Sequence, residues 1–535
     1  MHGIVRRASN LSRSRIVCWL WQHLMDGDAL VGMLMRSFRQ FQFAALGIVL
    51  LTVVTRLPAI LDSRPISDEA VYSVVANEIV DGGRPYVDAV DRKPPLLFWT
   101  YAAVFEATGK SNWMALHTVA LVWTLCTMAG LYVIGRRLFD RETGLIAGLL
   151  YGVFQPWATL HNDNLGFNGE LLMNLPIVWA WAIAFGKGSS RARPELLAAG
   201  ALLCAGFLLK QPAAIAAVPL GIYLLLPSYR ASRNLTWMAS VTHAAMLTGG
   251  FFAALGLIAI LLQEQGVLRE AFYWTVIHHS AGHDVFWSKG VVRTLEFVGV
   301  CLPLMLGVTM AYCNDSGVWA DKRSERTALL AFLAASAIGA AASGRFYHHY
   351  YIQLMPPLAL LAAPHYARLW SGRTQPRNLL LRPAVTYAWL ALAVAWFSIV
   401  QWHWRGVASH YKPCETARYL SEHSAPDDRI FVWGNKPTIY LEARRRPSCR
   451  YILTFPLTRS VFGERLLPID RIVPDAWKTL EEDFAKHPPA YIVDIQYGDG
   501  PQHYPIRDFP ILARLLEQRY RLVARTAEGV VYRRL

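Results

Sequence analysis

The sequence predicts an all-α polytopic membrane protein that ends in a small α/β domain. Apolar residues make up 54% of the 535 residues and only 17% are charged, whereas about a quarter of the residues in a soluble protein are charged. About eleven apolar stretches have the length of a helix that crosses a hydrocarbon core of about 30 Å. After residue 402 these stretches stop, and charged residues, Pro and Arg become frequent. The composition therefore excludes both a purely soluble enzyme and a disordered chain.

The predicted spans follow one another along most of the chain. One apolar stretch, 195–228, contains Lys210-Gln211-Pro212 in its middle, so we divide it there. The alternative is one long span followed by a re-entrant segment. The expected limits are 40–61, 113–138, 141–160, 169–187, 195–210, 211–228, 237–262, 291–313, 327–343, 351–370 and 383–402.

Lys and Arg are distributed unevenly between the loops that join these spans. If the N-terminus is cytoplasmic, about fifteen of them fall in the short inside loops and about four in the later outside loops. The positive-inside rule predicts this asymmetry, and an odd number of spans puts the C-terminal domain outside. The net charge of +15 is thus scattered over short loops, and we expect the lipid bilayer and no nucleic acid as a partner.

Three regions follow from this reading. Residues 1–39 form a basic cytoplasmic segment, residues 40–402 form the transmembrane domain, and residues 403–535 form the outer α/β domain. In the outer domain, β-like runs occur at Arg429–Gly434, Ala490–Ile495 and Tyr520–Tyr532, with helical patterns near Cys414–His423 and Trp477–His487. Cys414 and Cys449 both fall there, either as a disulfide or as two free thiols.

The first outside loop, residues 62–112, is the longest and carries two charged groups. Asp68-Glu69 opens an amphipathic helix that has Tyr72 on one face and ends at Gly82-Gly83. Asp91-Arg92-Lys93 precedes Pro94-Pro95 and a second amphipathic segment. We expect two short interfacial helices here. The alternatives are that Asp68 only caps its helix and that Arg92 and Lys93 only reach lipid phosphates.

Other polar residues also gather on the outer side. Lys210 stands beside a helix break and so is expected to face a cavity. His161, Asp163 and Glu170 lie in the second outside loop, for which an ordinary turn is the alternative. Arg345, His348 and His349 stand among aromatic residues that by themselves would suit an interfacial belt. His279 and His283 have a spacing that suits a metal, but two His residues alone are weak support for one.

Together these residues place two acidic groups and at least four basic or His groups at the outer face. Arg and Lys stabilise a phosphate leaving group, and a carboxylate serves as a base. Because the spans lie beside this site, we expect a lipid-borne substrate that carries a phosphate.

The order of these motifs resembles the GT-C glycosyltransferases, within the protein O-mannosyltransferase and aminoarabinose transferase group. The resemblance covers roughly residues 40–402. It is carried by Asp68-Glu69 just after the first span, Asp91-Arg92-Lys93-Pro94-Pro95-Leu96, Gly169-Glu170-Leu171-Leu172-Met173, Lys210-Gln211-Pro212 and His349-Tyr350-Tyr351-Ile352-Gln353-Leu354-Met355-Pro356-Pro357.

The resemblance implies a glycosyltransferase of the bacterial inner membrane that moves a sugar from a polyprenyl-phosphate-linked donor on the periplasmic side. It implies Asp68 as the base, Glu69 as its support, and Lys93 as the cation that holds the donor phosphate. We expect Arg92, Lys210, Arg345 and His349 to contribute to the phosphate site. The substrate cavity is expected to include Tyr72, Asp91, His161, Asp163, Glu170 and His348.

One departure concerns the residue before Lys93. The aminoarabinose transferase has Glu there, whereas this chain has Arg92, with Asp91 one place earlier. A metal or acceptor role attached to that Glu is therefore in doubt, and a divalent cation is left open. No other cofactor is expected.

Other functions remain as alternatives. A transporter or flippase of a lipid-linked sugar would place its ionisable residues near the midplane and show a repeat, and neither pattern is seen. A non-enzymatic membrane protein has no need for the acidic pair and the Lys-Pro motif together. Another lipid-dependent transferase, such as an O-antigen ligase, is the nearest enzymatic alternative. The sequence leaves open which sugar is moved and whether the acceptor is a glycan, a lipid or a protein.

Overall fold

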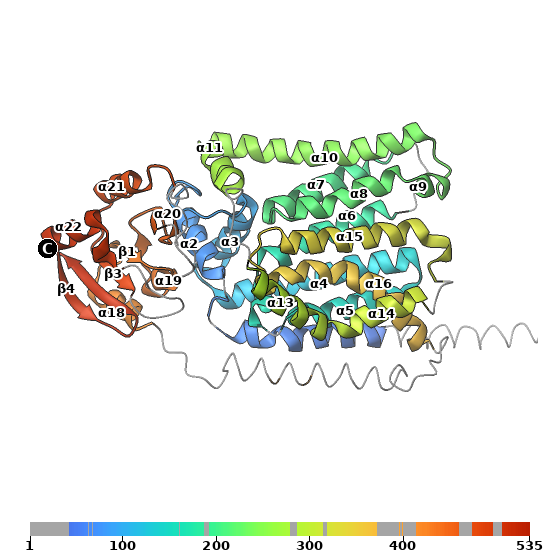
Figure 1. Ribbon diagram of the computed structural model, residues 1–535, viewed down its shortest axis with the longest axis horizontal. Helices are drawn as coiled ribbons and strands as arrows, with labels where there is room; N and C mark the ends of the chain where they lie inside the picture. The colour runs from blue at the N-terminus through green and yellow to red at the C-terminus, as the bar shows by residue number, and fades with distance from the viewer. Residues whose placement is uncertain are drawn as a thin grey trace, which may run out of the picture. The chain divides into compact units, whose positions relative to one another are not determined.

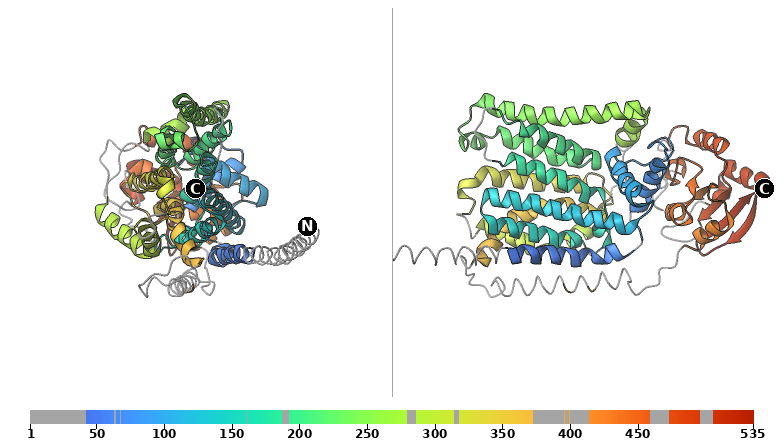
Figure 2. Two further views of the ribbon diagram at one scale, coloured as in Figure 1. Left: turned by 90° about the vertical axis from the view of Figure 1, so that its right-hand side faces the viewer. Right: turned by 180° about the vertical axis from the view of Figure 1, so that it is seen from behind.

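The computed structural model describes residues 42–62, 64–66, 68–159, 161–186, 192–278, 286–313, 318–371, 395, 399, 414–458, 473–495 and 505–535. Its long helices lie side by side, and two shorter helices lie at one end of them (Figures 1 and 2). The long helices begin where polar caps and apolar runs meet. Asn112, Asp140 and Thr236 each accept a hydrogen bond from a backbone N–H in the first turn of the helix that follows.

Helices occupy the first ten predicted spans. The first is the helix Gln42–Leu61. The others are α4 (Trp113–Leu138), α5 (Arg141–Phe154), α6 (Gly169–Ala184), α7 (Glu195–Leu209), α8 (Ala213–Leu225), α10 (Trp237–Glu264), the pair α13 (Trp287–Val300) and α14 (Leu302–Cys313), α15 (Arg323–Ala341) and α16 (Met355–Trp370). The predicted division at Lys210-Gln211-Pro212 is confirmed, because α7 ends before it and α8 begins after it.

Length and composition do not confirm the expected number of about eleven spans. Among the described residues, three helices are long and apolar enough to cross a membrane, namely Gln42–Leu61, α4 and α10. The pair α13 and α14 passes the same test together, but its two halves are bent by 68°. Helices α6, α7 and α8 are apolar but shorter. The eleventh expected span, 383–402, lies outside the described residues except for residues 395 and 399.

Small residues allow the close packing of α7 on α10. A Cβ atom at Gly200 would lie 1.9 Å from the carbonyl oxygen of Leu247, and one at Gly250 would lie 2.0 Å from that of Leu197. Glycine on each helix therefore lets the two backbones meet directly, as is common for helix pairs in membranes.

The first outside loop contains the two expected helices, α2 (Glu69–Val80) and α3 (Pro95–Thr108). Gly82, with φ of 80°, lies in the turn after α2, where a left-handed backbone favours glycine. Most of α2 is buried, including both Glu69 and Glu78, rather than one face alone. The expected one-sided burial is thus wrong for α2, because α3 and the helix α19 (Thr438–Ala443) of the outer domain both pack on it.

The C-terminal domain is a small α/β unit, as expected. Its five-stranded sheet has the order β2-β1-β3-β5-β4, in which β1 is parallel to β2 and β3, and β5 is antiparallel to β3 and β4. The strands are β1 (Arg429–Trp433), β2 (Arg446–Pro447), β3 (Tyr491–Ile495), β4 (Tyr520–Arg525) and β5 (Gly529–Arg534). The three predicted β-like runs correspond to β1, β3 and the hairpin β4–β5.

One helix of this domain precedes its first strand in the sequence, and the others come between strands. They are α18 (Glu415–His423), α19, α20 (Phe455–Thr458), α21 (Ala476–Lys486) and α22 (Pro510–Arg519). The two predicted helical patterns correspond to α18 and α21. Cys414 and Cys449 are both free thiols, so they do not form the disulfide that was one of the two alternatives.

Candidate active site

Asp68 stands at the start of α2 but does not cap the helix with its side chain. Its backbone has φ of −64° and ψ of −12°, and no helical N–H donates to its carboxylate. Instead, the Tyr72 hydroxyl donates to Asp68 Oδ2 over 2.9 Å. The Asp68 side chain is 29% exposed. The alternative in which Asp68 only caps its helix therefore does not describe this carboxylate, which remains accessible.

Glu69 is held in place by three donors. The backbone N–H of Ile66 donates to Oε2 and that of Phe167 donates to Oε1, each over 2.6 Å. His117 Nε2 lies 3.0 Å from Oε2, and its Nδ1 lies 2.6 Å from the carbonyl oxygen of Ala59. Glu69 is fully buried. Its carboxylate thus ties the start of α2 to the second outside loop and to α4.

His349 lies among three carboxylates. It belongs to the 3-10 helix η5 (His348–Leu354), and its side chain is 2% exposed. Its Nε2 lies 3.9 Å from Asp68 Oδ2 and 4.0 Å from Glu170 Oε2, whereas its Nδ1 lies 3.5 Å from Asp163 Oδ2. The fold thus brings together the first outside loop, the second outside loop and the segment before α16.

Asp163 joins His349 to a second His. Its Oδ1 lies 3.1 Å from His161 Nδ1. Burial alone would raise the pKa of Asp163, but hydrogen bonding to His161 and His349 and their positive charge lower it well below its ordinary value. The same hydrogen bond raises the pKa of His161. Asp163 therefore stays ionised within the cluster.

The surroundings of His348 lower its pKa, in contrast to those of His161. Its ring stacks on that of His161, with centroids 4.5 Å apart, and its Nδ1 lies 3.7 Å from Glu296 Oε2. Burial, followed by the charges of His161 and Arg293, lowers the pKa of His348 to about 4. His348 is therefore neutral around pH 7.

Lys210 is paired with Glu170 beneath this cluster. Its Nζ lies 2.8 Å from Glu170 Oε1 and 5.0 Å from the centre of the Tyr350 ring. Both side chains of the ion pair are at least 95% buried. A Cβ atom at Gly169 would lie 2.7 Å from the Cδ atom of Lys210, so a glycine there leaves room for the lysine chain. The break between α7 and α8 thus directs this cation into the protein.

Lys93 differs from Lys210 because it has no partner. Among the described residues its side-chain amine makes neither a hydrogen bond nor an ion pair, although its carbonyl oxygen accepts one hydrogen bond. The loop before it folds on itself, since Tyr86 N–H donates to Ala89 O and the Tyr86 hydroxyl donates to Lys93 O over 2.8 Å. Burial, followed by the charge of Lys210, lowers the pKa of Lys93 to about 8.

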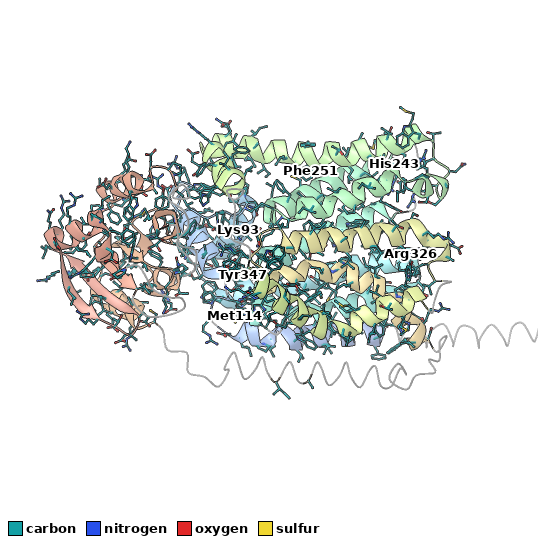
Figure 3. All side chains as sticks on the ribbon, viewed as in Figure 1. Lys93, Met114, His243, Phe251, Arg326 and Tyr347 are labelled. Atoms are coloured by element: carbon teal, nitrogen blue, oxygen red, sulfur yellow. The ribbon has the colours of Figure 1, made fainter. Side chains whose placement is uncertain are left out.

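Lys93 in turn affects Asp68. Burial alone would raise the pKa of the Asp68 carboxyl, but the charge of Lys93 and of neighbouring basic side chains lowers it below its ordinary value. The site therefore contains an accessible carboxylate and, within its electrostatic influence, a lysine without a bound anion. Figure 3 shows Lys93 and Tyr347 at one end of the long helices, whereas His243 and Arg326 lie at the other end.

Three expected site residues have other surroundings. The guanidinium of Arg92 lies over Phe455 of the C-terminal domain, 5.1 Å from the ring centre. That of Arg345 lies over Phe286, at 4.9 Å. The carboxylate of Asp91 is buried, and its Oδ2 has no hydrogen-bond partner among the described residues. The structure thus brings several of the other expected residues together around Asp68 and His349, and it gives Arg92 and Arg345 aromatic contacts.

Two residues of the site were missed in the sequence. His117 supports Glu69, and Tyr350 covers Lys210. A lone His within an apolar span is a signal for His117, because an ionisable side chain there needs a partner. In the described part of the chain, no group of three His, Cys, Asp or Glu side chains could hold a metal ion. His279 and His283 lie outside the described residues.

The sequence itself matches one known family. Residues 92–255 match the model of a family described as dolichyl-phosphate-mannose-protein mannosyltransferase. This match covers Lys93, Glu170 and Lys210. No curated protein sequence gives a match.

Solved structures resemble the chain over most of its length. ArnT from Cupriavidus metallidurans, bound to undecaprenyl phosphate, has a TM-score of 0.60 at 15% sequence identity, and the match covers 92% of this chain and 97% of that one. The Archaeoglobus fulgidus oligosaccharyltransferase, tethered to an acceptor peptide, has a TM-score of 0.52 at 13% identity, covering 85% and 69%. Another structure of that archaeal enzyme, AglB with an inhibitory peptide and a dolichol-phosphate, has a TM-score of 0.51 at 15% identity, covering 85% and 69%.

At these identities the structural matches establish the fold, and the family match covers the part of the chain that carries Lys93 and Lys210. Both findings agree with the resemblance carried by the motifs. The structural matches thus show that the chain has the fold of these proteins, and the family match shows that residues 92–255 are similar to the dolichyl-phosphate-mannose-protein mannosyltransferases.

Proposed function

We propose that the protein transfers a sugar from a polyprenyl-phosphate-linked donor to an acceptor hydroxyl. The observation that carries this proposal is that Lys93, whose amine has no partner among the described residues, lies within electrostatic influence of the ionised carboxylate of Asp68. Two proteins with a similar fold have been solved with undecaprenyl phosphate or dolichol-phosphate bound, which supports a lipid phosphate as the donor. Lys93 and Asp68 supply the support that comes from this chain itself.

Lys93 holds the donor phosphate in this proposal. A buried amine with a pKa near 8 is mostly protonated at pH 7, and it gains an anion that it otherwise lacks. Lys210 is a weaker candidate, because Glu170 already neutralises it at 2.8 Å. Its charge contributes at longer range and keeps Asp68 ionised. Arg92 is left out of the phosphate site in this proposal, since its guanidinium lies over the Phe455 ring.

The reaction is a single displacement at the anomeric carbon. The acceptor oxygen forms the new bond, while the bond between that carbon and the phosphate oxygen breaks. Its electron pair stays on the polyprenyl phosphate, which Lys93 stabilises. Asp68 Oδ1 or Oδ2 takes the proton of the acceptor hydroxyl. One displacement inverts the configuration of the sugar.

Asp68 is a weak base, because its pKa lies below the ordinary value. A weak base suffices if the anomeric carbon carries positive charge in the transition state, since the attacking hydroxyl then becomes acidic as the bond forms. Tyr72 orients the carboxylate through its 2.9 Å hydrogen bond. Glu69, His349 and Asp163 hold the surrounding segments in place and are not needed as proton acceptors.

We also propose that the site faces the periplasm of a bacterial inner membrane. Arg446 of the C-terminal domain pairs with Glu78 of the first outside loop, which is consistent with both parts being on one side. The uneven distribution of Lys and Arg places that side away from the cytoplasm. Residues 1–39, 40–402 and 403–535 remain the proposed cytoplasmic, transmembrane and periplasmic regions.

The test uses the purified full-length protein in lipid nanodiscs. Radiolabelled polyprenyl-phosphate sugars are offered one by one with extracted envelope glycans, lipids and proteins, and label transfer is counted. Asp68→Asn keeps the shape of the side chain but removes its basicity, so transfer should fall by about 10²–10⁴-fold. Glu264→Gln, at an exposed carboxylate at the end of α10, is the matched control and should keep full activity.

Lys93→Gln tests the phosphate site separately. It should raise the KM for the donor far more than that for the acceptor, because only the donor carries the phosphate. Lys478→Gln, at an exposed lysine of α21, is its control. Full transfer by Asp68→Asn would contradict the proposed base, and an unchanged donor KM in Lys93→Gln would contradict the phosphate site.

A further inference from the structure

A second site lies at the far end of α2 from Asp68. A cavity of about 720 Å³ is enclosed by α2, the segment 110–113 and the region from α19 to β2 of the C-terminal domain. Pro65, three residues before Asp68, also lines it. Val74, Asn77, Glu78 and Asp81 contribute one side of α2. The volume falls in the range of about 300–1,000 Å³ that is usual for small-ligand sites.

The lining of this cavity carries charges of both signs. Four basic and three acidic side chains face it, namely Lys110, Arg444, Arg445 and Arg446, and Glu78, Asp81 and Glu442. Arg446 pairs with Glu78, and Lys110 pairs with Asp81. Glu442 accepts the backbone N–H of Cys414 over 2.8 Å. The carboxylates are therefore engaged by the protein itself.

One cation of the cavity remains unengaged. Arg445 is buried and donates to Ser424, Ser421 and backbone carbonyls near its own position. Arg444 is exposed, and its guanidinium makes no hydrogen bond or ion pair with any part of the chain that the structure describes, whereas its backbone bonds to Leu441 and Arg445. Among the residues that the structure describes, no group pairs with this positive charge of the cavity.

Arg444 also has an uncommon backbone conformation. Its φ of 53° and ψ of 44° lie in the left-handed region, which disfavours residues other than glycine. Ser111, which also lines the cavity, has φ of 56°. Strained residues of this kind are concentrated at ligand sites, where the surrounding structure holds them in place. Arg444 and Ser111 both line this cavity, and Arg444 carries the charge that has no partner.

The remaining lining suits hydroxyl groups and a sugar ring. Asn77 donates to Ser111 Oγ over 3.0 Å, and its own Oδ1 is buried without a partner. That carbonyl oxygen is an acceptor available to a hydroxyl donor. The half-buried Trp113 supplies a flat apolar surface, which accommodates the C–H face of a sugar while its polar edge stays hydrated.

We propose that this cavity binds a saccharide unit of the acceptor, one that carries a carboxylate or phosphate group, with Arg444 as the partner of that group. The inference rests on the proposed function and adds the class of acceptor. Helix α2 links the two sites, because it begins beside Asp68 and its later turns line the cavity. Ten residues of helix separate Asp68 from Glu78, which is about 15 Å. An acceptor of several sugar units spans that distance.

The same lining disfavours two other occupants. A lipid chain would cover a lining with seven charged side chains, and it would offer no partner to the guanidinium of Arg444. A peptide that extends the sheet would have to pair with β2, the edge strand beside the cavity. That strand has only two residues, and Pro447 has no N–H to donate. A saccharide meets neither obstacle.

The experiment measures binding without turnover. Full-length protein in nanodiscs, with no donor present, is titrated by calorimetry with three disaccharides: digalacturonate, trehalose 6-phosphate and uncharged trehalose. We expect at least one acidic disaccharide to bind at least tenfold more tightly than trehalose. Arg444→Glu should weaken that binding at least tenfold, and Arg444→Gly, which relaxes the backbone, should weaken it as well. Arg521→Glu, at an exposed arginine of β4, is the control and should bind like the wild type.

Each outcome decides the proposal. Digalacturonate and trehalose 6-phosphate distinguish a carboxylate from a phosphate. Equal binding of trehalose, binding that Arg444→Glu leaves unchanged, or no binding of any disaccharide would overturn it. The proposal would also be overturned if a peptide of Ser and Thr residues binds through Arg444 and the disaccharides do not. Thermal melting of each variant shows that it is folded. Because donor and catalysis are absent, this result is independent of the Asp68→Asn test.

Discussion

Arg446 of the C-terminal domain and Glu78 of α2 form a two-pronged ion pair. Arg446 Nε donates to Glu78 Oε1 over 2.9 Å, and Nη2 donates to Oε2 over 2.5 Å. The Glu78 side chain is 3% exposed and that of Arg446 is 37% exposed. Nearby, Val90 N–H donates to the carbonyl oxygen of Arg450 over 3.0 Å. The C-terminal domain therefore holds the helix that begins at Asp68.

Arg446→Ala should lower the stability of the folded protein. It leaves Glu78 charged and buried, which in a fully buried pair costs about 3–5 kcal/mol. Since Arg446 is partly exposed, water compensates part of this, and we expect a loss of about 1–3 kcal/mol. Thermal melting in nanodiscs measures it. The double variant Glu78→Gln with Arg446→Ala should recover part of the loss, and a melting temperature unchanged in Arg446→Ala would contradict the role of this pair.

Tyr72→Phe should reduce the rate and shift its pH dependence. The phenol stabilises the ionised form of Asp68, so its removal raises the pKa of that carboxyl. A hydrogen bond to a charged group is worth about 1.5–3 kcal/mol, which corresponds to a loss of about tenfold or more in kcat. The acid limb of the kcat profile should move to higher pH. Tyr351→Phe, which removes a hydroxyl bound to Thr294, is the control, and identical acid limbs in Tyr72→Phe and wild type would refute the prediction.

The pKa of Lys93 predicts that the affinity for the donor falls at basic pH. Its pKa of about 8 means that it is charged below this pH and neutral above it, so donor affinity should be lost as the pH rises through about 8. The profile of kcat/KM reports the free enzyme and should show this limb, whereas bound phosphate raises the pKa and shifts the limb in kcat upward. Lys93→Arg keeps the charge at all these pH values and should abolish the limb. If the basic limb persists in Lys93→Arg, another group causes it.

Glu69→Gln should lower the stability of the folded protein, whereas Asp68→Asn should leave the stability nearly unchanged and lower the rate of transfer. Glu69 accepts from Ile66 N–H and Phe167 N–H, and an amide nitrogen in place of one oxygen leaves a buried donor unsatisfied. Such a loss costs about 1–3 kcal/mol. Asp68 is partly exposed and makes one hydrogen bond, so its variant should melt within about 0.5 kcal/mol of the wild type. Melting curves compare the two, and equal stability would mean that Glu69 is not the structural anchor inferred here.

Much of the fold follows from local properties of the sequence. The apolar stretches predict the helices, since a helix in lipid must satisfy its own backbone. Lys210-Gln211-Pro212 predicts the break between α7 and α8, because Pro212 cannot donate to a continuing helix. The burial of α2 on most sides was not predictable in this way. It depends on α19, more than 350 residues away in the sequence, which packs against it.

The candidate site shows the same limit. The residue types and their sidedness point to Asp68, Lys93 and His349 as members of one site. Their neighbours in sequence did not reveal that Arg92 turns to Phe455 while Lys93 stays unpaired. Adjacent basic residues look alike in a sequence, and only the packing of the loop separates them.

By itself, the sequence predicted the apolar helices, the small C-terminal α/β domain and the outer side as the place where the chemistry gathers, and the structure bears out the first two. These depend on hydropathy, on helix breakers and on the placement of Lys and Arg, which act over short distances along the chain. Only the tertiary structure decided that Glu69 is an anchor, that Asp163 joins His161 to His349, and that a charged cavity separates α2 from β2. The physical reason is that burial, ion pairing and pKa depend on groups that meet only after the chain has folded.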